Sequence, residues 1–99
     1  MTEQNLIALE EICIHHKIEV AFIHSLQETG LVKVIKVNEA LYIENDQLPT
    51  LEKYIDFHYT LGINLEGIET ISHLLQRLNT LQEEVSQLKN KLNFHLHTP

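Results

Sequence analysis

Residues 6–30 read LIALEEICIHHKIEVAFIHSLQETG, and the spacing of apolar side chains in this stretch decides the fold. The segment from Leu6 to His16 places Leu9, Ile12 and Cys13 at the three- and four-residue intervals of an amphipathic helix. Cys13 therefore faces the core as a small apolar side chain. The first element predicted from the sequence is a helix over residues 6–16.

A second helix follows after a short break at residues 17–19. The run from Val20 to Thr29 keeps helical spacing and is followed by Gly30, where a left-handed cap is least strained. Its buried face is expected to consist of Phe22, Ile23 and Leu26. Two short helices joined by a tight turn predict a helix-turn-helix.

Two β-rich runs then predict a hairpin. Residues 31–37 contain four β-branched side chains, and residues 41–43 follow after the loop 38–40. A two-stranded hairpin is marginal on its own. We therefore expect this hairpin to pack on the helices as a wing.

The remaining sequence predicts two more helices. Asp46 is the expected N-cap of a helix over residues 47–60, with Pro49 in its first turn. Its inward side chains are Leu48, Leu51 and Ile55. Residues 61–64 form a turn, and Asn64 is a candidate cap for the last helix.

The last helix carries a seven-residue apolar repeat. Core positions recur without interruption over three heptads before the pattern stops at His95. The predicted seam is Ile71, Leu74, Leu78, Leu81, Val85, Leu88 and Leu92. One alternative is a helix folded back over the first domain, but the favoured interpretation is a homodimer.

Charge divides the chain into an acidic part and a nearly neutral part. The chain carries 14 Asp and Glu against 7 Lys and Arg, a net charge of −7. Residues 1–60 hold ten acids and four bases, and residues 61–99 hold four acids and three bases. We therefore expect an acidic helix-turn-helix module with a wing over residues 1–62 and a dimerisation helix over residues 63–99.

This charge bears directly on partners. Proteins that bind nucleic acid neutralise phosphates with Lys and Arg, yet this chain has the single arginine Arg77. The exposed positions of the second helix are expected to be Val20, His24, Gln27 and Glu28, and Glu28 would repel phosphates. Direct nucleic-acid binding is disfavoured, and a basic protein partner is favoured.

The sequence offers little for catalysis or for a metal. No nucleophile elbow or phosphate-binding loop is present. The adjacent His15 and His16 diverge on a helix, and one cysteine leaves no four-ligand zinc pattern. We expect no enzyme activity, no metal and no cofactor. The single Cys13 and the absence of a long apolar run favour a cytoplasmic protein without a membrane span.

Three stretches resemble MerR-type winged-helix regulators. These are residues 9–13 (LEEIC), residues 22–32 (FIHSLQETGLV) and residues 61–68 (LGINLEGI). The last is similar to the Leu-Gly-Phe-Ser-Leu-Glu-Glu-Ile segment that leads into the MerR dimer helix. The resemblance implies a mainly α fold, namely a MerR-like winged helix-turn-helix with a short β-hairpin wing and a long C-terminal coiled-coil helix. It also implies an antiparallel dimer.

The chain departs from the MerR pattern at the DNA contacts. MerR regulators carry Thr-Leu-Arg-Tyr-Tyr on the second helix, where this chain has residues 22–26 (FIHSL), with His24 in place of the arginine. The wing motif Tyr-Arg-Tyr-Tyr is replaced by residues 40–43 (ALYI). An acidic MerR-like module without these contacts is similar to the CbpM family of chaperone modulatory proteins.

That resemblance implies a regulator that binds the J-domain of a CbpA- or DnaJ-like co-chaperone and blocks its stimulation of DnaK. The candidate partner-binding residues are Glu10, Glu11, His24, Glu28, Tyr42, Glu44 and Asp46. Two other functions stay open. One is a divergent MerR-type transcription factor that grips DNA through Lys33 and Lys36, and the other is an adaptor with a different protein partner.

Overall fold

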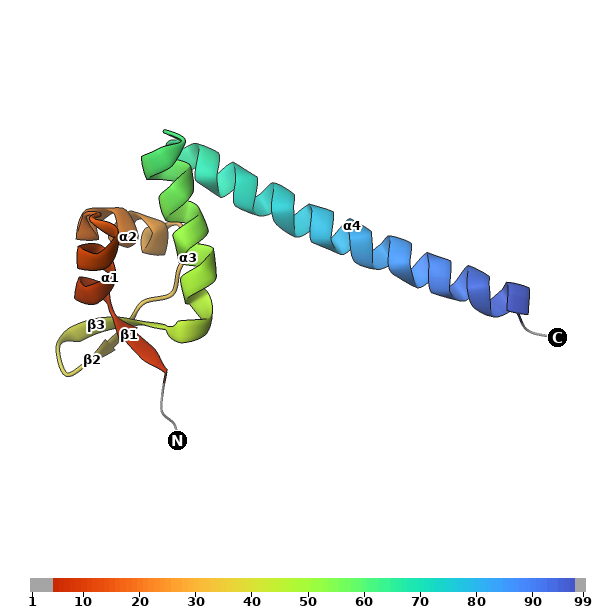
Figure 1. Cartoon of the computed structure of the whole chain (residues 1–99), viewed down its shortest axis with the longest axis horizontal. Helices are drawn as coiled ribbons and strands as arrows, with labels where there is room; N and C mark the ends of the chain where they lie inside the picture. Colours follow the sequence, from red (N-terminus) through yellow and green to blue (C-terminus); the bar gives the residue numbers. More distant parts are fainter. Residues whose placement is uncertain (1–4, 98–99) are drawn as a thin grey trace. The chain divides into compact units, whose positions relative to one another are not determined.

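The computed structural model describes the chain over residues 5–97, with side chains up to His95. The helices are α1 (Leu9–His16), α2 (Val20–Glu28), α3 (Leu48–Ile55) and α4 (Leu65–His97), and the strands are β1 (Leu6–Ala8), β2 (Ile35–Val37) and β3 (Ala40–Glu44) (Figure 1). A 3₁₀ turn over Asn45–Gln47 precedes α3, and a π-helical turn over Asp56–Thr60 follows it. The chain divides into two compact units, the first ending at Glu69 and the second beginning at Thr70.

The first three residues of the predicted N-terminal helix form β1 instead. This strand pairs antiparallel with β3, with Ile7 opposite Ile43, and the sheet has the order β1-β3-β2. The Asn45 amide extends the pairing by donating a hydrogen bond to the Asn5 carbonyl at 2.7 Å. The prediction of a helix from Leu6 is therefore wrong at its start. A short apolar run is compatible with a helix or with a strand. Residues 6–8 form a strand because the open edge of β3 offers them backbone hydrogen-bond partners.

The break between α1 and α2 is confirmed. Lys17 adopts a left-handed conformation with φ of 58°, and the Ile18 amide bonds back to the Cys13 carbonyl at 3.0 Å. This closes α1 in the manner of a C-terminal cap and turns the chain into α2. Gly30 ends the second helix with φ of +83°, as the sequence predicted.

The wing is a shorter hairpin than predicted. Asn38 and Glu39 both have positive φ, as a two-residue type I′ turn requires. Only Ile35–Val37 of the predicted strand 31–37 pairs with β3. Residues 31–34 are not strand, because the side-chain amide of Gln47 takes the place of a neighbouring strand at Lys33. It accepts a hydrogen bond from the Lys33 backbone N–H at 3.1 Å and donates one to the Lys33 carbonyl at 3.2 Å.

The predicted helix 47–60 is present as α3 together with the π-helical turn, but Asp46 is not its N-cap. Asp46 lies within the preceding 3₁₀ turn, and Gln47 occupies the cap position without a side-chain bond. The extra turn moves the helix start past Asp46. The cap predicted at Asn64 is confirmed, because its Oδ1 accepts a hydrogen bond from the Gly67 amide at 2.8 Å at the start of α4.

One apolar core holds the first unit together. The predicted inward side chains of α1 and α2 are buried, as are Leu51 and Ile55 of α3, while Leu48 is half-buried. Side chains from α2, β3, α3 and the first turn of α4 are fully buried at its centre. These are Ile23, Leu26, Ile43, Leu51 and Ile68.

The second unit is the remainder of α4, and its apolar seam is uncovered in the single chain. From Leu74 to Leu92 the seam side chains are between 43% and 65% exposed, and Ile71 is half-buried. The fold class predicted from the sequence is thus confirmed as mainly helical, with a small winged sheet and a long C-terminal helix. None of the described helices combines the length and the apolar character that a membrane span requires.

Candidate functional site

The outward face of α2 carries no cationic side chain of the kind that grips DNA. Val20, His24, Gln27 and Glu28 are all exposed, as the sequence predicted. The helix, with the sequence VAFIHSLQE, contains no Lys or Arg. Because phosphate contacts come chiefly from these two residue types, this face is poorly equipped for a nucleic-acid backbone.

The sheet has one face toward the core and one face away from it. Side chains alternate along a strand, and residues opposite each other in neighbouring strands point to the same side. Ile43 is fully buried and Ile7 packs against the core, so the alternate positions of β1 and β3 point outward. The same register places Ile35 opposite Tyr42 and Val37 opposite Ala40 on that outward side.

This outer sheet face is mainly apolar, with one carboxylate. It consists of Leu6, Ala8, Ile35, Val37, Ala40, Tyr42 and Glu44. Leu6 and Val37 are exposed, and Ile35 and Tyr42 are half-buried. The described residues that form the core or pack against it include Ile7 and Leu41 but none of these seven. Adjacent apolar side chains around a tyrosine are typical of protein-binding surfaces.

The structure brings only some of the candidate residues together. Tyr42 and Glu44 share the outer sheet face, and Asp46 lies exposed in the turn directly after β3. His24 and Glu28 are exposed on α2.

The two candidate acids of α1 have different surroundings. Glu10 and Glu11 are both exposed, but Glu11 lines a groove formed with residues of α3. Glu10 does not line that groove.

Sequence reasoning missed the apolar part of the outer sheet face. Leu6 and Ala8 belong to the outer sheet face because residues 6–8 form a strand, whereas the sequence predicted a helix there. Ile35 and Val37 alternate with Lys36, a signal that the sequence does contain. The register with β3 was needed to show that this alternation points away from the core.

Cys13 is a buried side chain in α1, as predicted. It is 8% exposed, and burial raises the pKa of its thiol above the ordinary value. A thiol that stays protonated is a poor nucleophile and a poor metal ligand. Among the side chains that the structure describes, residues 5–95, no three His, Cys, Asp or Glu are grouped so that they could hold a metal ion.

Comparison with known protein families gives one match. The sequence profile of a family described as MerR HTH family regulatory protein matches residues 7–90. No curated protein and no solved structure matches the chain. The matched range begins in β1, covers the helix-turn-helix and the wing, and includes every predicted seam residue except Leu92.

Proposed function

The chain belongs to the MerR HTH family of regulatory proteins, and from that premise we propose that it regulates by binding another protein. Its partner is the J-domain of a CbpA- or DnaJ-like co-chaperone, and binding inhibits the stimulation of DnaK by that co-chaperone. The chain acts without catalysis of its own.

The observation that carries this proposal is the chemistry of α2. The helix that would read DNA in a helix-turn-helix exposes His24, Gln27 and Glu28, with no Lys or Arg along its length. The wing adds the exposed Lys33 and Lys36, but residues 1–60 hold ten acids against four bases. The electrostatic attraction that supplies most non-specific DNA affinity is absent from such a module.

The same charge favours a basic protein surface. J-domains engage DnaK through a basic helix and the adjacent His-Pro-Asp loop, so an acidic module that covers the basic helix would block that engagement. Acidic side chains supply steering toward a basic partner, and an apolar patch supplies the anchor. The outer sheet face offers such an anchor in Tyr42, with the Glu44 carboxylate on the same face.

The functional unit that we propose is an antiparallel homodimer formed through α4. The seam keeps its heptad repeat over three heptads, and its side chains from Leu74 onward are exposed in the single chain. A sustained seam of this kind buries its apolar side chains against a second helix. A second copy of the chain is the simplest partner that supplies one.

Isothermal titration calorimetry tests the proposal. The full chain is titrated with a purified J-domain of a CbpA-like protein, and in parallel with duplex DNA, at low and at moderate salt. We expect micromolar or tighter binding to the J-domain, weakened by salt, and loss of affinity when the basic helix of the J-domain is neutralised. Salt-sensitive binding to duplex without a J-domain complex would instead support the transcription-factor function.

A further inference from the structure

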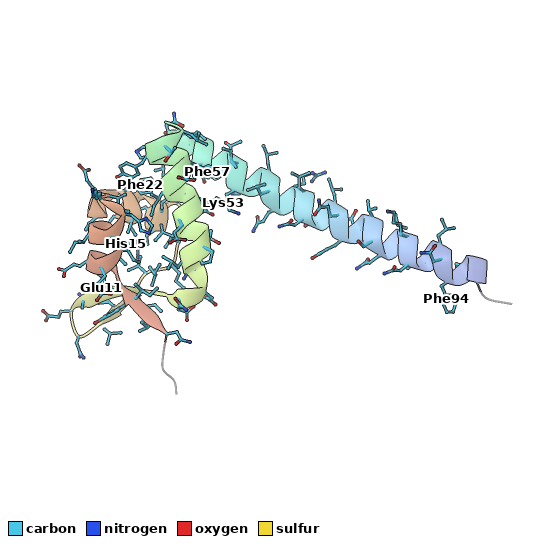
Figure 2. The ribbon with its side chains drawn as sticks, viewed as in Figure 1. Glu11, His15, Phe22, Lys53, Phe57 and Phe94 are labelled. Carbon is cyan, nitrogen blue, oxygen red and sulfur yellow. The ribbon has the colours of Figure 1, made fainter. Side chains whose placement is uncertain are left out.

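A groove of about 390 Å³ lies in the first unit, where residues of α1 and β1 meet residues of α3. Its lining combines apolar side chains with carboxylates and imidazoles. Figure 2 shows Glu11 and His15 on α1, one helical turn apart. We call this feature the α1–α3 groove. Its lining includes Ile7, Glu11, Ile12, His16, Leu48 and Glu52.

The apolar part of the groove is fixed by the core. Ile12 is buried with 3% of its surface exposed, and Ile7 and Leu48 are half-buried and pack against the core cluster. These three side chains belong to three different elements that share that core. The apolar lining is therefore preformed, which lowers the entropic penalty for binding.

The acidic part of the groove comes from two helices. Glu11 lies on α1 and Glu52 on α3, so each of the two helices contributes a carboxylate to the groove lining. The Oε2 atom of Glu52 is 3.3 Å from His16 Nε2, and the two side chains are 47% and 24% exposed. The His16 imidazole thus contacts the Glu52 carboxylate at the groove, and this half-exposed carboxylate remains accessible to another donor.

Carboxylates above an apolar lining match one kind of side chain. A long cationic side chain packs its methylene stem on apolar surface while its charged head reaches polar groups. A planar guanidinium presents several N–H donors in fixed directions and binds carboxylates through paired hydrogen bonds, whereas an ammonium is a single point of charge.

We propose that the α1–α3 groove receives an arginine side chain from a basic helix of the protein partner. The arginine stem packs on Ile7 and Leu48, and its guanidinium bonds Glu11 and Glu52 in exchange for the His16 contact. This inference rests on the proposed function for the identity of the partner. It adds a binding pocket on α1 and α3, separate from the outer sheet face.

The test uses the ¹⁵N-labelled full chain and NMR titration with a helical peptide of Ala, Leu and Arg. A matched peptide has lysine in place of each arginine, and a second has glutamine. We expect the arginine peptide to shift the amide signals of Ile7, Glu11 and Glu52, and the glutamine peptide to bind at least tenfold more weakly. The proposal would be overturned if the arginine and lysine peptides bound with equal affinity. It would also be overturned if the shifted amide signals came from residues outside the groove, or if no signal shifted at millimolar peptide.

Substitutions in the chain provide the matched controls. Glu11→Gln and Glu52→Gln should each weaken the binding of the arginine peptide about tenfold, because each substitution removes a charge-assisted contact. Glu19→Gln removes the same charge from an exposed position just before α2, outside the groove lining, and should change the affinity less than twofold. Equal losses of affinity from the substitutions at positions 19 and 11 would show a general charge effect and contradict a binding groove.

The J-domain titration separates this inference from the proposed function. If the J-domain binds and both groove variants keep wild-type affinity, the groove proposal is wrong and the proposed function stands. If the arginine peptide binds in the groove and the J-domain does not bind the chain, the proposed function is wrong and the groove proposal stands.

Discussion

Ile7 of β1 lies directly opposite Ile43 of β3 in the antiparallel pair, and both side chains face the core. This pairing sets the register of the sheet, because one residue of slippage would turn the outer sheet face inward. It therefore fixes Tyr42 and Glu44 on the side of the sheet that points away from the core. The register links the stability of the first unit to the surface proposed for the partner.

Replacing Ile43 with alanine should destabilise the first unit by about 2–5 kcal/mol, since Ile43 is fully buried and its loss leaves a cavity. Urea unfolding followed by circular dichroism measures this change in the free energy of unfolding. Ile35→Ala removes the same atoms from the outer sheet face and should have less than half of that effect. Equal losses at the two positions would contradict the assignment of core and outer faces.

Tyr42→Ala should weaken J-domain binding at least tenfold, because tyrosines at the centre of an apolar patch frequently anchor protein interfaces. Calorimetry of the variant against the J-domain gives the affinity. Tyr42→Phe keeps the aromatic ring and should retain most of the binding. Wild-type affinity in the alanine variant, with the fold intact, would exclude the outer sheet face as the anchor.

Alkaline pH should weaken the folded state through Cys13. Burial raises the pKa of this thiol in the folded chain, so the unfolded chain releases the proton at a lower pH, near the ordinary value of about 8.5. Above that value the unfolded state holds fewer protons than the folded state, and the free energy of unfolding falls as pH rises.

The check is a series of urea unfolding curves between pH 7 and pH 10 for the wild type and for Cys13→Ala. The stability difference between them should narrow as pH rises, because only the wild type loses the contribution of the protonated thiol. A difference that stays constant across this range would show that the thiol does not titrate differently in the two states.

Placing a charge in the seam should separate the proposed dimer. Leu81→Glu puts a carboxylate at the middle of the heptad repeat, where an apolar side chain is required. Sedimentation equilibrium should then give the monomer mass at concentrations where the wild type is dimeric. Gln76→Glu adds the same charge on the side of the helix opposite the seam and should leave the mass unchanged. A wild-type chain that sediments as a monomer would contradict dimerisation through the seam.

Much of the first unit could be predicted from apolar spacing, because a helix that packs on one side repeats that face in its sequence. Residues 9–16 and 20–28 are helical as expected, and Asn64 caps α4 because its side-chain oxygen reaches the Gly67 amide. These elements follow from contacts between near neighbours in the chain.

The parts that could not be predicted depend on distant partners. Residues 6–8 form a strand only because β3, more than thirty positions later, offers an open edge. Residues 31–34 leave the sheet because the Gln47 side chain bonds the Lys33 backbone. The α1–α3 groove likewise combines Glu11 with Glu52, which no local pattern connects.

The central claim, that the chain blocks a J-domain from stimulating DnaK, is tested most directly by the steady-state ATPase rate of DnaK with a CbpA-like co-chaperone. Adding the full chain in excess should return the stimulated rate to the basal rate, while DnaK alone should keep its basal rate. The Tyr42→Ala variant should require at least tenfold more protein for the same inhibition. A stimulated ATPase rate that stays unchanged at a saturating concentration of the chain would contradict the claim that the chain blocks the J-domain.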